Sequence, residues 1–508
     1  MSHLPSKEET MRQWSSYQVK MFDRIKEMHN EEPSALVVEA VPGSGKTTTS
    51  VESMRLIDVR HSVAVLAFNK AIAEEMKRRV PPNCEATTIN SFGFRAVKAV
   101  NPRVRMDQWK TRNIMKVVVP NPEQRKGWEG TITRLVGLRK ATVKVGIDRY
   151  ELASWDEICE RYDVDAPGSN GFKSALDQVW TIALNDTSNI DFDDQWFHPI
   201  WYDLPIPQFD WVFVDEAQDL SSTQIELLRR IAPRIVAVGD PRQSIYGFRG
   251  ADSEAMTRLR EATNAKVLPL SICYRCPSKV IELANKVFNP EGAEGKDVIV
   301  AAPGAEPGVV DDVKLATLRK ECAPGSFVLC RTTAPLVKEC LKFIVEGVRA
   351  CVKGRDVGQQ LALLIDKVLN SSTVNGGSRS MDIVRFTEFL DSYFESEKAR
   401  LQAAQRDQQL QALEDRVECI YALSEGARTV DDIFARMDKV FSEEGDKGGV
   451  TFATAHRTKG LEADDIYILC PELMPFPKAK SEWAKLQEKN LQFVAYTRAM
   501  KRLRFVRN

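Results

Sequence analysis

The stretch Ala40-Val41-Pro42-Gly43-Ser44-Gly45-Lys46-Thr47 restricts the fold of this chain more than any other. It follows the apolar residues 35–38 and leads into the helix-compatible residues 48–52, the order that forms a phosphate-binding loop. Glycines at 43 and 45 let backbone N–H groups face an anion, and a helix N-terminus adds partial positive charge. Lys46 is then placed to reach the β- and γ-phosphates, and the Thr47 hydroxyl to ligate Mg²⁺. A chance Gly-Ser-Gly turn is the weaker alternative because such turns rarely join a strand to a helix.

Length and composition restrict the class of protein. A chain of 508 residues is expected to contain two to four domains, and 43% hydrophobic with 28% charged residues is typical of a globular protein. The 71 basic and 71 acidic residues cancel, so any nucleic-acid surface must be local. No stretch approaches a membrane-spanning apolar run, so we expect an intracellular protein, cytoplasmic or, in a eukaryote, nuclear.

Apolar segments alternate with helix-compatible segments over much of the chain. We expect strands in residues 35–38, 63–68, 84–88, 210–214, 234–238, 266–270, 326–330, 450–454, 465–469 and 503–506. Strands that alternate with helices form parallel sheets covered on both faces, and ligands bind at the carboxyl ends of such strands. The predicted fold class is therefore α/β, with a Gly-, Pro- and acid-rich linker at 289–324 between two sheets.

Two segments interrupt the alternation. Residues 101–208 are expected to form a mainly helical insertion whose six tryptophans anchor its core: Trp109, Trp128, Trp155, Trp180, Trp196 and Trp201. Its basic residues either contact a duplex backbone or form a solvated face: Arg125, Lys126, Arg134, Arg139, Lys140 and Lys144. Residues 357–447 are expected to form a second helical insertion, in which an apolar stripe from Leu410 to Ile420 indicates a helix pair or short bundle.

Paired acids follow the strand predicted at 210–214. Asp215 can hold Mg²⁺, and Glu216 can orient and deprotonate an attacking water. The loop 239–251 combines a neutral polar residue, two aromatics and an arginine, a mixture suited to reading phosphate on one side and stacking bases on the other. The Cys-x-x-Cys at 273–276 lacks two further ligands at zinc spacing, so we expect no metal there.

These motifs, in this order from Gln18 to Met500, resemble the superfamily 1 helicases of the UvrD, Rep and PcrA type. The variants at 215–219 and 68–70 are more similar to the F-box helicase and phage branches. The resemblance implies two RecA-like parallel-sheet motor domains with ATP between them. It assigns residues 1–100 and 209–288 to the first, 101–208 to its insertion, 289–356 and 448–508 to the second, and 357–447 to its insertion. Because the chain ends soon after Phe505, we expect no nuclease domain.

The resemblance also implies roles for single residues. ATP would be bound by Gln18, Val41, Pro42, Gly43, Ser44, Gly45, Lys46, Thr47, Thr48, Tyr274, Arg275, Glu462 and Arg498, with Mg²⁺ on Thr47 and Asp215. Gln18 would recognise adenine, Tyr274 would stack on it and Glu462 would face the sugar. Catalysis would use Lys46, Asp215, Glu216, the γ-phosphate sensor Gln243 and the arginine fingers Arg275 and Arg498. Nucleic acid would contact Phe68, Asn69, Thr88, Asn90, Tyr246, Phe248, Arg249 and His456.

The resulting expectation is an ATP-dependent helicase that moves 3′ to 5′ on single-stranded DNA and unwinds tailed duplexes in repair, replication or recombination. Two alternatives stay open. One is a translocase that strips proteins from single strands without processive unwinding, and the other is a nucleotide-switched binding module. RNA also stays possible as a substrate, because stacking and phosphate contacts do not distinguish the sugar.

Overall fold

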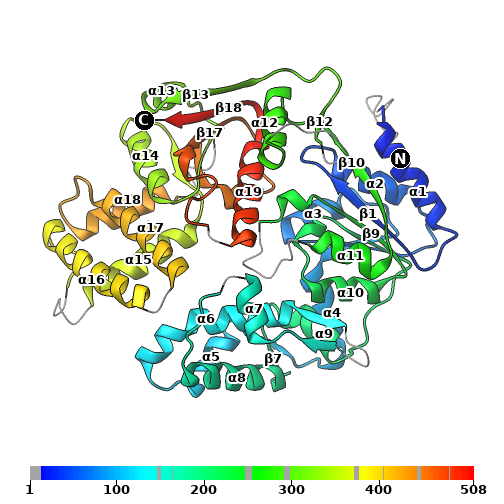
Figure 1. Cartoon of the computed structure of the whole chain (residues 1–508), viewed down its shortest axis with the longest axis horizontal. Helices are drawn as coiled ribbons and strands as arrows, with labels where there is room; N and C mark the ends of the chain where they lie inside the picture. The colour runs from blue at the N-terminus through cyan, green and yellow to red at the C-terminus, as the bar shows by residue number, and fades with distance from the viewer. Residues whose placement is uncertain are drawn as a thin grey trace, which may run out of the picture. The chain divides into compact units, whose positions relative to one another are not determined.

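The computed structural model describes residues 13–145, 150–162, 164–245, 254–290, 298–370, 377–403, 406–442, 448–479 and 481–507. The chain divides into two compact units, and Figure 1 labels their elements. The first unit comprises Met1–Trp155, Ser174–Tyr274 and Gly295–Val300, and the second comprises Asp156–Lys173, Arg275–Glu294 and Ala301–Asn508. Within the described residues, no helix combines the length and apolarity needed to cross a membrane.

The first unit contains a six-stranded sheet in which every pairing is parallel, in the order β10-β1-β9-β8-β2-β3. Its strands are β1 (Ser34–Ala40), β2 (Val63–Ala67), β3 (Cys84–Thr88), β8 (Trp211–Val214), β9 (Arg234–Gly239) and β10 (Lys266–Leu270). Its helices are α1 (Ser16–Met28), α2 (Lys46–Arg55), α3 (Lys70–Lys77), α4 (Ile89–Val100), α10 (Ser222–Ile231) and α11 (Ala255–Thr263). Both β1 and β8 are buried almost throughout, as the continuous apolar runs predict for a sheet covered on both faces.

One core cluster of this unit joins the sheet to α1 and α2. Leu36 and Val38 of β1, two positions apart and hence on one face, pack with Met21 and Ile25 of α1 and Met54 of α2. Helix α10 begins after a capping box formed by Ser221 and Gln224, which the Ser-x-x-Gln spacing predicts. The carboxyl ends of all six parallel strands lie at one edge of the sheet, where the phosphate-loop sequence follows β1.

The predicted insertion at 101–208 is mainly helical, with two short ribbons. Its helices are α5 (Lys110–Val118), α6 (Pro122–Ala141), α7 (Trp155–Tyr162), α8 (Asn170–Asn185) and α9 (Asp194–Trp201). The parallel ribbon pairs β4 (Arg105–Met106) with β7 (Asn189–Ile190), and the antiparallel ribbon pairs β5 (Val143–Val145) with β6 (Tyr150–Leu152). Trp180 and Trp196 are buried as core anchors, whereas Trp109 is exposed, which corrects the expectation for that residue.

The second unit contains another six-stranded, wholly parallel sheet, in the order β13-β18-β17-β14-β16-β15. Its strands are β13 (Val309–Lys314), β14 (Phe327–Cys330), β15 (Ala350–Val352), β16 (Val450–Thr454), β17 (Ala463–Leu469) and β18 (Ala499–Arg507). Helices α12 (Ser278–Phe288), α13 (Leu315–Glu321), α14 (Ala334–Val345) and α19 (Glu482–Tyr496) also belong to it. Two parallel sheets with their helices confirm the predicted α/β class.

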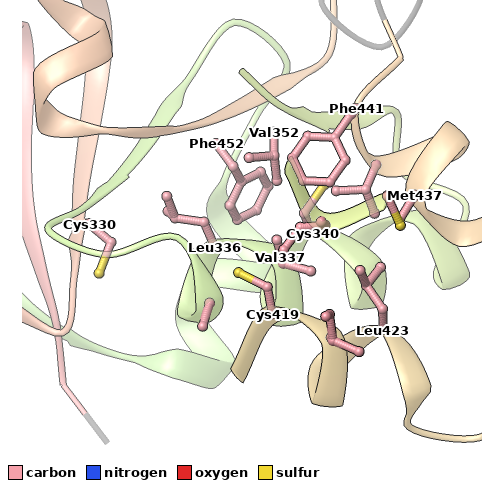
Figure 2. Packing of buried hydrophobic residues seen from close by; sticks show 14 of the residues in the cluster. Cys330, Leu336, Val337, Cys340, Val352, Cys419, Leu423, Met437, Phe441 and Phe452 are labelled. Carbon is pink, nitrogen blue, oxygen red and sulfur yellow. The ribbon is translucent and has the colours of Figure 1, made fainter. Parts of the chain in front are cut away.

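The second insertion forms a helical bundle that shares its core with this sheet. The bundle consists of α15 (Arg355–Leu369), α16 (Ile383–Ala403), α17 (Asp407–Ser424) and α18 (Val430–Val440). Figure 2 shows side chains of the shared cluster from α14, the sheet and the bundle: Leu336, Val337, Cys340, Val352, Phe452, Cys419, Leu423, Met437 and Phe441. In addition, the Asp415 carboxylate of α17 accepts the N–H groups of Thr333 and Ala334 at 2.9 and 3.0 Å, which caps α14.

Two expected boundaries differ from the structure. The segment 289–324, expected as a linker, contains β12 (Val300–Ala301), which pairs with β11 (Ile272–Cys273), and it also supplies β13 and α13 of the second unit. Residues 275–288, expected in the first core, group with the second unit because α12 packs on α19, with the Phe288 and Phe493 rings 5.4 Å apart. Likewise, 156–173 of the first insertion groups with the second unit.

Candidate functional site

The loop between β1 and α2 has the backbone shape of an anion cradle. Gly43 and Gly45 have φ angles of 66° and 78°, in the left-handed region that side chains disfavour. The N–H groups of the first turn of α2 have no partners within the helix, as at any helix start. The Ser44 hydroxyl is buried in the same loop and has no hydrogen-bond partner among the described residues. An anion in the loop would satisfy these donors, so the residues present fit a phosphate group.

Two backbone hydrogen bonds hold this loop against the chain that follows β10. The Val41 N–H donates to the Leu270 carbonyl at 3.1 Å, and the Tyr274 N–H donates to the Gly43 carbonyl at 2.9 Å. The second bond places Tyr274 beside the phosphate loop with about half of its side chain exposed. A half-exposed ring beside a phosphate loop is available for stacking, consistent with the predicted contact to a base.

The predicted acid pair faces the first residues of α2. The Thr47 hydroxyl donates to Asp215 Oδ2 at 3.2 Å, and Lys46 Nζ lies 3.7 Å from Glu216 Oε1. Burial raises the pKa of Asp215 to about 6, and the neighbouring Glu216 charge adds to the rise, while Lys46 and the Thr47 bond oppose it. Asp215 and Thr47 thus present adjacent oxygen ligands of the kind that Mg²⁺ prefers.

A chain of side-chain hydrogen bonds connects the acid pair to the loop after β9. The Gln218 amide donates to Glu216 Oε2 at 2.5 Å and accepts the Asp240 N–H at 3.0 Å, and Gln243 donates to Asp240 Oδ2 at 3.0 Å. Gly239 leaves space for this chain, since a Cβ there would lie 2.4 Å from Gln218 Oε1. The connection links the predicted sensor Gln243 to the predicted base Glu216. Sequence reasoning assigned no role to Gln218, although its place just after the acid pair was the available signal.

Gln18 is buried beside the phosphate loop. Its amide nitrogen donates to the Thr49 hydroxyl at 2.9 Å and lies 3.7 Å from where a Cβ of Gly45 would be. Its amide oxygen accepts the Ser15 N–H at 3.0 Å, in the capping box that starts α1. The predicted adenine-reading amide therefore lies next to the loop but is engaged in local bonds, which a base would have to replace.

The remaining predicted nucleotide residues lie together at the amino end of two strands in the second unit. Glu462 precedes β17 and is paired with Arg275, with Nε and Oε2 2.5 Å apart. Arg498 precedes β18 and is buried, with Nε donating to the Val494 carbonyl at 2.8 Å and Nη1 to the Leu461 carbonyl at 3.3 Å. The structure thus holds Arg275 by a carboxylate and Arg498 by backbone carbonyls.

His456 lies at the opposite, carboxyl edge of that sheet, just after β16 in the 3₁₀ turn Ala455–Thr458. Burial lowers the pKa of its imidazole to about 3, and the charges of Arg331 and Arg457 lower it further. A neutral imidazole among arginines can accept or donate a hydrogen bond without adding charge.

The predicted nucleic-acid residues of the first unit follow β2 and β3. Asn69 accepts the Ile72 N–H at 2.9 Å and caps α3, and Thr88 accepts the Ser91 N–H at 3.1 Å and caps α4. Phe68, next to Asn69, is half-buried. Both helix starts lie at the same sheet edge as the phosphate loop. The predicted contacts Tyr246, Phe248 and Arg249 lie outside the described residues.

Asn90 contacts Phe192, an aromatic residue that the sequence analysis did not single out. Its amide donates to the Phe192 carbonyl at 2.8 Å, and the Phe192 side chain is 57% exposed. The surrounding Asp191, Asp193 and Asp194 gave the available signal, because an aromatic residue within an acidic turn has few apolar neighbours in sequence. Phe192 is therefore a further candidate for contact with bases.

Arg139 and Lys140 of the predicted basic run are structural, which corrects both interpretations of these two residues, the duplex contact and the solvated face. The Arg139 guanidinium lies 4.1 Å from the Trp155 ring centroid and 4.9 Å from that of Trp180. Lys140 is buried, with Nζ 2.6 Å from Asp191 Oδ2 and 2.7 Å from Asp194 Oδ1. Neither side chain is available to a phosphate backbone, because both hold the insertion together.

No group of three or more His, Cys, Asp or Glu side chains able to hold a metal occurs within the ranges that the structure describes. Cys273 and Cys276 are buried, and the Cys276 thiol donates to the Thr497 carbonyl at 3.4 Å.

Comparison with known proteins gives matches along most of the chain. Family models match residues 25–249 as an AAA domain, 383–507 as a UvrD-like helicase C-terminal domain and 188–328 as a viral superfamily 1 RNA helicase core domain. F-box DNA helicase protein 1 of Schizosaccharomyces pombe is 24% identical over 92% of this chain and 55% of its own length. ATP-dependent DNA helicase PcrA of Bacillus subtilis is 24% identical over 50% of this chain and 37% of its own length. DNA helicase II of Escherichia coli is 25% identical over 41% of this chain and 35% of its own length. The chain thus spans about half or less of these relatives.

Proposed function

Because the chain belongs to the superfamily 1 helicases of the UvrD and PcrA type, we propose that it is an ATP-dependent DNA helicase. The proposal includes 3′ to 5′ movement on single-stranded DNA, unwinding of tailed duplexes and a role in repair, replication or recombination inside the cell. These finer properties follow the relatives' family rather than any contact in the structure.

The observation that carries the proposal is the arrangement of Lys46 and Thr47 opposite Glu216 and Asp215, 3.7 and 3.2 Å apart. Residues 41–48 would hold the phosphates of ATP, and Thr47 with Asp215 would hold Mg²⁺, which neutralises charge on the phosphates when bound. Lys46 would then exchange its Glu216 neighbour for a phosphate oxygen. Glu216 Oε1 would become available to accept a proton from water, while Oε2 keeps its bond from Gln218.

Four further side chains would act on the reaction. Gln218 orients the Glu216 carboxylate through the 2.5 Å bond, and Gln243 reports on the γ-phosphate through Asp240. Arg275 and Arg498 would stabilise negative charge on the transferred phosphoryl group, as arginine fingers do. To do so, Arg275 must exchange Glu462, and Arg498 its carbonyl partners, for phosphate oxygens.

Single-stranded DNA would lie along the first sheet's carboxyl edge, on the helix starts at Asn69 and Thr88 and on Asn90. Phe192 adds an exposed ring for stacking next to Asn90. The proposed contacts to nucleic acid also include Phe68, Tyr246, Phe248, Arg249 and His456. RNA is the alternative substrate, favoured by the match to a viral RNA helicase core at residues 188–328.

The test is steady-state ATP hydrolysis with and without single-stranded DNA, with Lys46→Ala as the blank. We expect strong stimulation by DNA and none in the variant. On tailed duplexes, stimulation without unwinding would instead support the protein-stripping translocase. Hydrolysis indifferent to both DNA and RNA would overturn the motor proposal and support a nucleotide-switched binding module.

A further inference from the structure

The parallel β4–β7 ribbon of the first insertion directs two chain segments to one place. Met106 pairs with Ile190, and the Asp107 N–H donates to the Ile190 carbonyl at 2.9 Å. Because the two strands are parallel, both chains leave the ribbon at the same end. One chain reaches Trp109 three residues after Met106, and the other reaches Phe192 two residues after Ile190.

The apolar side chains around this end face solvent. Trp109 is 49% exposed, Met106 41% and Phe192 57%, while Trp180 and Trp196 of the same insertion are buried. Large exposed apolar side chains that recur in one place mark binding surfaces more often than single scattered ones do. Met106, Trp109 and Phe192 therefore form a candidate contact surface rather than part of the hydrophobic core.

Both the backbone and the ring of Trp109 have partners. Its backbone N–H donates to Asp107 Oδ1 at 2.9 Å, and the Arg112 guanidinium carbon lies 4.5 Å from its ring centroid. Arg112 is in turn held by Glu129, with Nε and Oε1 2.9 Å apart. The guanidinium covers part of the indole, and the exposed remainder is available to a planar ligand.

On the Phe192 side of the surface, the backbone and the neighbouring acids are held. Asp191 and Asp194, on either side of it in sequence, are paired with Lys140 and Lys110 at 2.6 and 2.8 Å, and Lys110 is fully buried. The Phe192 carbonyl is bound by Asn90, which follows β3. This hydrogen bond makes the surface continuous with the proposed DNA contact at the sheet edge.

The charges around the surface favour an anionic partner. Arg103, Arg105 and Lys116 are exposed, and the Lys116 ammonium contacts only the neutral Asn113 side chain in the described hydrogen bonds. Of the nearby acids, Glu129, Asp191 and Asp194 are each paired with a cation, and Asp107 accepts from the Trp109 backbone N–H and from Asn113. Asp193 also lies next to Phe192 in the chain. Exposed rings beside cationic side chains are the combination that binds single-stranded nucleic acid.

We propose that Met106, Trp109 and Phe192, with the flanking Arg103 and Arg105, form a ribbon surface that binds single-stranded nucleic acid as a continuation of the contact at Asn90. This inference rests on the proposed function, since it extends the same strand-binding site onto the insertion. Trp109 stacks on a base, and the arginines contact the phosphates on either side.

The test measures binding of the full chain to fluorescent oligothymidylates of increasing length. Trp109→Ala should weaken binding of the longer strands by about 5- to 100-fold, the range for losing one stacking platform, and leave the shortest bound strands unaffected. Trp109→Phe should restore most of the affinity. Arg105→Ala should lower the slope of log affinity against log salt by about 0.7, the value for one phosphate contact on a single strand.

Val117→Ala is the matched control, because Val117 is a 75% exposed apolar residue on the adjacent helix α5. Equal affinity of wild type and Trp109→Ala at every length, with DNA-stimulated hydrolysis intact, would overturn the ribbon surface alone and leave the motor in place. Absence of stimulation in the wild type would instead overturn the proposed function. Ultraviolet crosslinking of a long strand should label the peptide that contains Trp109, and labelling elsewhere only would also contradict the inference.

Discussion

The two six-stranded parallel sheets use their edges differently. In the first sheet, the phosphate loop, the acid pair and the predicted contacts to nucleic acid all follow the carboxyl ends of β-strands. In the second, His456 follows β16, whereas Glu462 and Arg498 precede β17 and β18 at the amino edge. The predicted nucleotide residues therefore precede strands of the second sheet, whereas the predicted nucleic-acid residue follows one.

The charges differ in the same way. At the first edge, Asp215 and Glu216 face Thr47 and Lys46, an arrangement that suits a Mg²⁺–phosphate complex. The second sheet presents arginines: Arg331 and Arg275 are paired with Glu488 and Glu462, and Arg498 donates to backbone carbonyls. Two sheets of the same architecture thus present acidic side chains in one unit and arginines in the other. Function resides in the residues at the ends of the strands rather than in the sheet.

The strongest test of this comparison is Glu216→Gln at the first edge. Removing the proposed base while keeping the side chain's size should lower ATP turnover by about 10²- to 10⁴-fold and leave ATP and DNA binding intact. Steady-state hydrolysis and nucleotide binding measure the two effects, with Glu226→Gln on α10 as a control acid outside the site. Turnover close to wild type would remove Glu216 from the base role.

Arg498→Lys and Arg498→Ala test the amino edge of the second sheet. As an arginine finger, Arg498 should contribute about 10³-fold or more to turnover, and lysine should not replace its forked geometry. Its bonds to the Val494 and Leu461 carbonyls also predict that alanine costs about 1–3 kcal/mol of unfolding free energy. Urea denaturation separates the two effects. Hydrolysis unchanged in a folded lysine variant would assign Arg498 a structural role only.

A smaller effect should distinguish the two edges by pH. The Asp215 pKa is raised from 3.8 to about 6, so the folded state binds more protons than the unfolded state across that window, and rising pH lowers stability. The His456 pKa is lowered from 6.5 to about 3, so the folded state binds fewer protons there, and rising pH increases stability.

Replacing Asp215 and replacing His456 should therefore change the slope of the unfolding free energy against pH in opposite directions. From pH 4 to 6, Asp215→Asn should make stability rise more steeply than in the wild type, and His456→Gln should make it rise less or fall, each by about 1–2 kcal/mol. Urea denaturation of the free protein at several pH values checks the signs. If both replacements changed the slope with the same sign, the opposite effects of burial on the two pKa values would be contradicted.

Local signals predicted much of this molecule. The run of apolar residues, glycine turn and Lys46-Thr47 predicted β1, the loop and α2, because the whole signal lies in one short segment. The acid pair after β8 was predicted for the same reason. The α/β class followed from many such segments, each independent of distant contacts.

The errors lie where long-range packing decides. Arg139 and Lys140 have the composition of a solvated basic face, yet partners far along the chain, Trp180 and Asp191, bury them. The segment 289–324 has the composition of a linker, yet β13 pairs with β18 nearly two hundred residues later, with Val310 opposite Leu503. Neither partnership leaves a periodic pattern in the local sequence. Gln18 was placed near the site, but the Ser15 and Thr49 bonds that engage its amide depend on the packing of α1 against α2.

The core shared by α14, the second sheet and the bundle α15–α18 has an evolutionary consequence. A segment that packs only against itself can be deleted or exchanged between relatives as a separate module. Here deletion of residues 355–447 would expose Leu336, Val337 and Cys340, all fully buried, and would uncap α14 by removing Asp415. The bundle and the sheet of the second unit therefore share one core, so a chain without the bundle would require a redesigned surface on α14.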